Sequence, residues 1–323
     1  MAQNTTNTTA FIEAQQYSKF ILENLHDELL PSTFYRDVSD FGSGTTLNIK
    51  SVGSASIQDV AEDVPLTFNA IDTSTVTLGI TNYTGDAWSV NDDLREDGAQ
   101  IETLSAMRAQ ESVRALQQDH ETKFLKACND AQTANGDNAI NSIKHRFVAN
   151  GTDRAIEIQD LAYMRYAFDK ANNPQGGRIA IVDPSFALTM DTTTNLVNVS
   201  NNPHFEGMIT DGFRKGHQFV RNIYGWDIYV SNRLHQVTAA EASLNDRDDN
   251  TTASVAGDVA NVFMCVADDN VKPIMHAWRR MPKTEGWRDH DNRQDKFQVT
   301  SRFGFGAQRM DGLGILISNP STY

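Results

Sequence analysis

Residues 246–257 carry the acidic and amide side chains that calcium prefers. Asp246, Asp248 and Asn250 have the first three ligand spacings of a calcium-binding loop. Thr251 replaces the glycine that such a loop needs for its turn, and Gly257 replaces its final glutamate. We therefore expect residues 236–258 to form a solvated surface loop and predict no metal site there.

Two other patterns resemble ligand-binding motifs, and each lacks a necessary part. Asp289-His290-Asp291 offers carboxylate and imidazole ligands, but the sequence places no second cluster to complete a metal site. Gly304-Phe305-Gly306 looks like the start of a dinucleotide-binding turn, but Arg309 stands at its third glycine position. Nucleophile-elbow and phosphate-loop motifs do not occur. We predict no catalytic residue and no cofactor, so we do not expect an enzyme.

The two cysteines and one isolated lysine have ordinary explanations. Cys128 and Cys265 lie among apolar residues, which is typical of core thiols. Lys50 is the only lysine between Lys19 and Lys123, and we expect it to be a solvated surface residue.

The formal net charge of −14 is unevenly distributed. Residues 1–130 hold 20 acidic against 8 basic residues, a net of −12. This acidity argues against a protein that binds nucleic acid by neutralising phosphates. The segment from Arg279 to Arg309 is the exception, with eight basic and four acidic residues. It predicts a mixed solvated face, a partner for the acidic face of a neighbouring subunit, or a contact with DNA, and the partner for an acidic face is the better functional interpretation because the rest of the chain is acidic.

The N-terminal residues predict an arm. Residues 1–10 are polar, and an apolar helical pattern then ends at Pro31. This segment is too polar near its start to form a compact unit alone, so we expect it to pack against another surface. No apolar run approaches the roughly 20 residues of a membrane span, and we expect no membrane partner.

Residues 45–90 predict an extended β-hairpin. Leu47 and Ile49 alternate with polar residues in one stretch, and Val76, Leu78 and Ile80 alternate in a second stretch. The residues between them, 53–71, are acidic and have no periodic apolar set. The hairpin therefore has one apolar face that needs a partner surface.

Residues 92–130 predict a helix of roughly 45 Å, interrupted only by Gly98. Residues 150–235 have an α/β pattern, with helices at 157–172 and 203–210 and strands at 178–182, 218–224 and 226–230. Further strands are expected at 262–267, 273–278, 296–305 and 313–317.

This order of elements resembles the major capsid proteins of tailed bacteriophages with the Hong Kong 97 (Johnson) fold. Gly225–Asn232 is similar to a strand pair of their axial domain, and Phe303–Gly314 is similar to their closing hairpin. The resemblance implies an α+β fold of five parts. These are an N-terminal arm (1–42), an extended loop (43–91), a peripheral domain with the spine helix (92–149), an α/β axial domain (150–258), and C-terminal strands that complete the peripheral-domain sheet (259–323).

The resemblance also implies a function. The chain would assemble through hexamers and pentamers into an icosahedral shell around the double-stranded DNA of a tailed phage, without sequence-specific DNA binding. The subunit would be located in the virion after assembly in the host bacterial cytoplasm. No charged prodomain precedes the arm, which favours a separate scaffolding protein. The resemblance also implies a portal protein and allows a decoration protein as partners.

The residues expected at contacts between subunits lie on the arm and on the apolar face of the hairpin. They are Phe20, Leu25, Leu47, Ile49, Val76, Leu78 and Ile80. Two alternatives remain at this stage. One is an encapsulin-like compartment of the same fold, which a neighbouring cargo gene would indicate. The other is an enzyme with an unrecognised site, such as an α/β hydrolase, which a monomeric mass in solution would favour.

Overall fold

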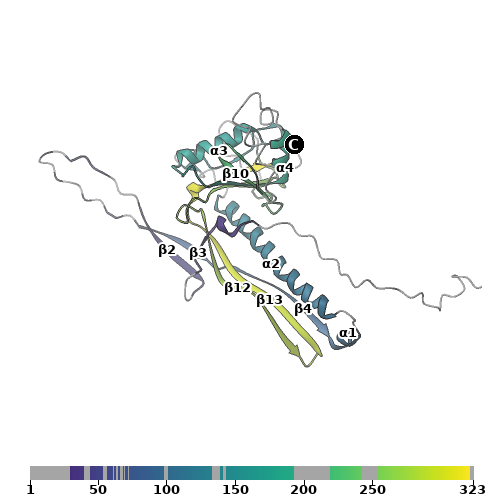
Figure 1. Cartoon of the computed structure of the whole chain (residues 1–323). Coiled ribbons are helices and arrows are strands. Elements are labelled where there is room, and N and C mark those ends of the chain that lie inside the picture. The colour runs from purple at the N-terminus through teal and green to yellow at the C-terminus, as the bar shows by residue number, and fades with distance from the viewer. Residues whose placement is uncertain are drawn as a thin grey trace, which may run out of the picture.

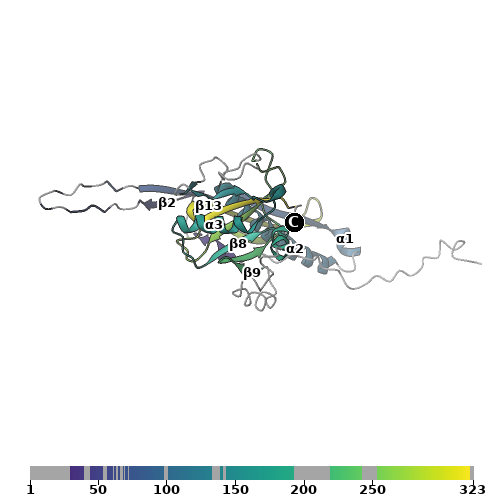
Figure 2. The ribbon, with the colours of Figure 1, turned by 90° about the horizontal axis from the view of Figure 1, so that it is seen from above.

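A computed structural model of the chain describes residues 30–39, 44–53, 57–60, 62, 65, 68, 70, 71, 73–97, 101–132, 139, 140, 143–192, 219–241 and 253–320. An α/β domain forms one end, and a long sheet with a helix along it forms the other (Figure 1). A hairpin projects from the side of the molecule (Figures 1 and 2). The predicted arm helix before Leu30, the predicted helix 203–210 and residues 246–250 lie outside the described residues.

The projecting hairpin consists of β2 (Thr46–Val52) and β3 (Thr73–Gly79), which pair in antiparallel register. Leu47 lies opposite Leu78, and Ile49 lies opposite Val76. Directly opposite residues share a face of a sheet, so the predicted hairpin and its single apolar face are confirmed.

The long sheet has four strands in the order β1-β12-β13-β4. Its members are β1 (Arg36–Asp37), β4 (Asn82–Asn91), β12 (Ile274–Asp289) and β13 (Gln294–Ala307). Alternate residues of β4 are half-buried and exposed, because one face of the sheet is covered and the other is open.

The covered face packs against α2 (Ile101–Ala131), a helix of 31 residues and about 46 Å. A short helix, α1 (Asp92–Asp97), precedes it. The predicted long helix is therefore confirmed, and Gly98 falls in the segment between α1 and α2 that lies outside the described residues.

The run Phe303-Gly304-Phe305-Gly306 contacts different neighbours on its two faces. Phe303 and Phe305 face α2, where the Phe305 ring centroid lies 5.7 Å from that of Phe124. Gly304 and Gly306 face β3, and a Cβ on Gly304 would collide with the carbonyl oxygen of Gly79. The glycines allow the hairpin to cross the sheet closely, which explains this motif without a bound nucleotide.

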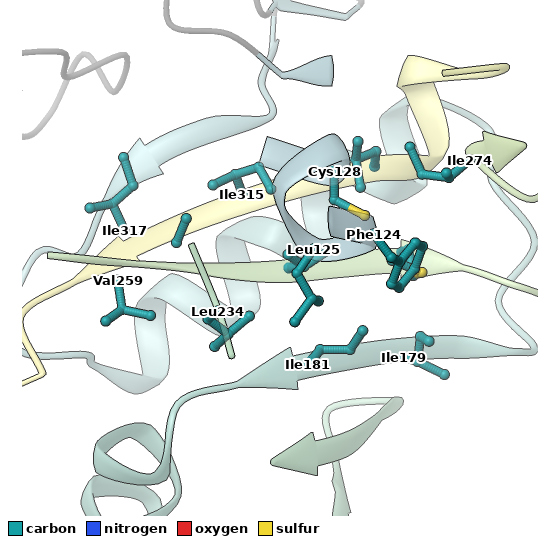
Figure 3. Packing of buried hydrophobic residues seen from close by; sticks show 14 of the residues in the cluster. Phe124, Leu125, Cys128, Ile179, Ile181, Leu234, Val259, Ile274, Ile315 and Ile317 are labelled. Carbon is teal, nitrogen blue, oxygen red and sulfur yellow. The ribbon is translucent and has the colours of Figure 1, made fainter. Parts of the chain in front are cut away.

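The α/β domain contains a six-stranded sheet in the order β7-β14-β11-β8-β10-β9. Its strands are β7 (Arg146–Val148), β8 (Arg178–Val182), β9 (Phe219–Ile223), β10 (Trp226–Val230), β11 (Val259–Cys265) and β14 (Leu313–Ser318). Helices α3 (Ile158–Lys170) and α4 (Pro184–Thr192) cover one face. The C-terminal part of α2 covers the other through Phe124, Leu125 and Cys128 (Figure 3).

Several short elements connect these parts. The pair β5 (Ala139–Ile140) and β6 (Ile143–Lys144) follows α2. Single turns of 3₁₀ helix occur at η1 (Ser32–Phe34), η2 (Thr152–Arg154) and η5 (Met310–Gly312).

Two expectations for the C-terminal region are wrong. Residues 259–323 do not all complete the long sheet, because β11 and β14 are inner strands of the six-stranded sheet, whereas β12 and β13 belong to the long one. Phe303–Gly314 is not a hairpin, since β13 pairs with β12 and β4 while β14 pairs with β11 and β7. The physical reason is burial on both faces: every residue of β11 and β14 is buried, so these strands suit a sheet with helices on both sides.

Candidate assembly surfaces

The base of the hairpin is buried against the subunit's own sheet. Leu78 is 0% exposed, and it packs against Met275 and Ala277 on the face of the sheet opposite α2. Ile80 is 5% exposed. The prediction that Leu78 contacts a neighbouring subunit is therefore wrong, because its apolar surface is already covered within the chain. A contact of Ile80 with a neighbour stays a prediction.

The remaining predicted contact residues have other positions. Leu47, Ile49 and Val76 are half-buried at the edge of the same small cluster. Phe20 and Leu25 lie outside the described residues. A contact of these five residues with a neighbour stays a prediction.

The far part of the hairpin is exposed and partly apolar. Ile57 is 96% exposed and Phe68 is 98% exposed. Three further apolar side chains near them are also exposed, namely Val52, Val60 and Ile71. Asp59 and Glu62 add exposed carboxylates. Large apolar side chains gathered on a projecting segment mark an interaction surface. Sequence periodicity could not locate this surface, because residues 53–71 have no apolar repeat.

A buried carboxylate fixes the point where the N-terminal segment meets the body. Glu121 on α2 accepts a hydrogen bond from the backbone N–H of Leu30 at 3.0 Å and one from the hydroxyl of Ser231 at 3.0 Å. The guanidinium of Arg233 lies 3.5 Å from the same carboxylate. Glu121 thus joins the N-terminal segment, α2 and the α/β domain at one point.

A mostly apolar pocket of about 300 Å³ opens beside this junction. Leu30, Tyr35 and Leu116 line it, together with Trp278 and Met281 from β12. The pocket lies beside Leu30, the first residue that the structure describes.

Two buried histidines connect α2 to the long sheet. Nε2 of His120 and Nε2 of His276 are 3.0 Å apart, within hydrogen-bond distance. Burial, with smaller contributions from the neighbouring His276 and Lys123, lowers the pKa of His120 to about 3. Burial also lowers the pKa of His276 to about 4, although Asp37 opposes this shift. Both imidazoles are therefore neutral near pH 7, and one donates its N–H to the other.

Most cations of the basic segment have partners within the subunit. Guanidinium nitrogens of Arg280 and Arg288 lie 2.6 Å from carboxylate oxygens of Glu285 and Asp92, respectively. Lys296 lies 2.5 Å from Asp289, and this bond lowers the pKa of the Asp289 carboxyl. The mixed-face interpretation fits these pairs.

The residues whose side chains could bind a metal or react lie on separate elements. Asp289 ends β12, and His290 and Asp291 lie in the turn to β13. Lys50 is exposed on β2, and both cysteines are buried. The part of the chain that the structure describes holds no group of three or more metal-ligating side chains. Among the described helices, none is both long and apolar enough to cross a membrane.

Comparison with known proteins is consistent across the chain. A family profile described as phage capsid protein matches residues 73–318. No curated protein matches. A chain from Mycobacterium phage Che8 is 16% identical, with 97% of this chain and 98% of that chain covered and a TM-score of 0.63.

Two cyanophage structures are similar to the same degree. A capsid chain of cyanophage P-SCSP1u is 15% identical, with coverage of 94% and 93% and a TM-score of 0.68. A chain of the cyanophage Pam1 capsid is 12% identical, with coverage of 97% and 98% and a TM-score of 0.67. At such identities the likeness concerns the fold.

Proposed function

This chain belongs to the phage capsid protein family, and from that premise we propose how its subunits build a shell. The protein is a major capsid protein with the Hong Kong 97-type fold, a structural subunit of the virion that associates with copies of itself. We propose that it forms hexamers and pentamers, and that the projecting hairpin of each subunit lies on a neighbour. An encapsulin-like compartment has the same fold, but the family match favours a phage capsid.

The exposed end of the hairpin is the observation that carries this proposal. Ile57 and Phe68 are almost fully exposed on a segment that projects from the body. Burying such a side chain stabilises a contact by about 1.5–3 kcal/mol. A shell repeats the same contact at every subunit, so a modest stabilisation is sufficient for assembly.

We further propose finer roles for the parts of the chain and for its partners. Residues 1–42 and the hairpin within 43–91 serve as the intersubunit elements, and the long sheet, α2 and the α/β domain together form the body. A separate scaffolding protein directs assembly in the bacterial cytoplasm, a portal protein occupies one vertex, and a decoration protein can bind outside. The shell encloses double-stranded DNA without reading its sequence, and the subunit catalyses no reaction.

The direct test is assembly of the expressed protein. The chain, alone or with a scaffold from the same genome, is examined by sedimentation velocity and negative-stain microscopy over a range of concentrations. We expect rings, tubes or shells. A single sharp monomer under all these conditions would contradict the proposal.

A further inference from the structure

Two arginines lie side by side on the open face of the long sheet. Arg280 on β12 is the register partner of Arg302 on β13, whose other partner is Tyr83 on β4. A register shift in β12 between Trp278 and Arg280 brings Arg280 opposite Arg302. Trp278 faces α2, where its ring stacks on His120, and simple alternation would send Arg280 to the same side. The irregularity instead places Arg280 beside Arg302 on the face away from α2.

Like charges directly opposite each other destabilise a sheet, so this pair has a cost for the isolated subunit. Glu285 partly offsets that cost, because its carboxylate oxygen lies 2.6 Å from Arg280. Within the described residues, no carboxylate lies at salt-bridge distance from Arg302. Among the described residues, the two guanidiniums therefore share a single carboxylate partner, Glu285.

The same arginines line a hollow of about 610 Å³. Its lining consists of Ile80, Thr81, Tyr83, Arg279, Arg280 and Arg302. Arg279 and Tyr83 are exposed, so the hollow is open to a partner. A hollow with several guanidiniums fits carboxylates, which arginine binds through two parallel hydrogen bonds.

We propose that this hollow binds the acidic end of the hairpin of a second copy of the chain, with Asp59 and Glu62 as the carboxylates that it receives. The inference rests on the proposed function and names the acceptor site for the hairpin. Charge complementarity carries it: the chain is strongly acidic overall, and both carboxylates are exposed on the projecting segment.

The geometry requires the partner to be another copy. Ile80 directly follows β3, so the hollow lies at the base of the hairpin. Asp59 lies beyond Val52, and the seven residues of β2 alone span about 23 Å. Donor and acceptor are thus at opposite ends of one projecting hairpin (Figure 1). A contact between different patches of two copies is head-to-tail, and such contacts close into rings when their rotation permits.

A charge exchange tests the proposal in the full-length protein. Arg302→Glu and the double variant Asp59→Lys/Glu62→Lys should each raise the concentration needed for assembly at least tenfold. Arg309→Glu and Glu96→Lys are matched controls, because both original residues are exposed and lie outside the hollow and the hairpin end. They should assemble like the wild type. Combining all three exchanges should restore assembly, since the charges are complementary again in the opposite sense.

Sedimentation measures assembly, and circular dichroism of each variant confirms that the subunit is folded. Arg302→Gln replaces Arg302→Glu if the latter does not fold. Three results would overturn the inference. The first is that the arginine variant assembles normally. The second is that the arginine variant fails to assemble and the exchanged hairpin does not restore assembly. The third is that the arginine variant forms normal shells that retain less DNA. If the wild type itself does not assemble, the proposed function fails instead.

Discussion

The α/β domain and the projecting hairpin are both built from strands, but they bury their side chains in different ways. The six-stranded sheet has helices on both faces, and residues such as Trp226 and Phe263 are 0% exposed. The hairpin has two strands, one apolar face and a far end whose described apolar side chains are exposed. The first region is stable through its own core, whereas the second gains burial only where another surface meets it.

The junction between these regions shows how one helix serves both. The C-terminal part of α2 packs into the core of the α/β domain through Leu125 and Cys128. His120, slightly earlier on the same helix, packs among the aromatic rings of the long sheet. A rigid helix shared by two sheets holds the base of the hairpin in a fixed direction relative to the α/β domain.

The largest expected effect on stability lies in the core of the α/β domain. Trp226 packs edge-on against Phe168 and Phe263, with ring centroids 4.9 and 5.0 Å away. Trp226→Ala should lower the free energy of unfolding by about 3–5 kcal/mol, because it leaves a cavity in a core that is covered on both sides. Chemical denaturation of the unassembled subunit measures this. A loss below about 1 kcal/mol would mean that this region is not the self-sufficient part of the molecule.

A second prediction concerns pH and the His120–His276 contact. Both folded-state pKa values, about 3 and about 4, lie below the ordinary value of 6.5. The stability that these neutral imidazoles contribute is complete above pH 6.5 and is lost progressively as the pH falls from 6.5 to the folded-state values of about 4 and about 3. The loss from His276 alone should be on the order of 3 kcal/mol.

Other charged groups near this pair also titrate or repel, and they define the control. Asp37 lies 3.9 Å from Nδ1 of His276, and Lys123 lowers the pKa of His120. Stability curves should therefore be compared between the wild type and a His120→Phe/His276→Phe variant from pH 7 to 4. The wild type should lose more stability than the variant. Parallel curves would show that the imidazoles are not held neutral by the fold.

An intermediate effect is expected where the hairpin crosses the sheet. Gly304→Ala places a methyl group against the carbonyl oxygen of Gly79, so β3 must shift away from β13. The cost should be about 1–3 kcal/mol, as for other overpacked sites. Gly176→Ala is a suitable control, because a Cβ there meets no atom within 4 Å. Equal melting temperatures for the two variants would argue against close crossing.

The smallest effect on stability is expected at the far end of the hairpin. Phe68 is 98% exposed, so Phe68→Ser should change the free energy of unfolding by less than about 0.5 kcal/mol. The same change should reduce assembly, because it removes apolar surface that a neighbour would bury. A clear drop in the melting temperature of the subunit would show that Phe68 belongs to the subunit core.

The local periodicity of apolar residues was sufficient to predict much of the fold. Alternation at Leu47, Ile49 and Val76 predicted the hairpin, and the helical pattern of residues 92–130 predicted the long helix. Both signals depend only on near neighbours in the sequence. Sheet membership depends on distant partners instead, which is why β11 and β14 were assigned to the wrong sheet.

The contact surfaces were less predictable for the same reason. Leu78 has the pattern of an open apolar face, and only the fold shows that Met275 and Ala277 already cover it. The Arg280–Arg302 pair depends on a strand irregularity that no periodicity reveals. The alternation of Phe303 and Phe305 with glycines could have indicated a strand with helix on one face and backbone on the other.

Truncation of the hairpin tests the central claim most directly. Residues 53–71 are replaced by Asn-Gly, which forms a tight turn between β2 and β3. The truncated subunit should keep its circular dichroism spectrum and its melting temperature within a few degrees, because the α/β domain and the long sheet retain their cores. The same sample should fail to form shells by sedimentation and microscopy under conditions in which the wild type assembles. An unfolded truncated chain, or one that assembles normally, would contradict the account of the hairpin as an intersubunit element.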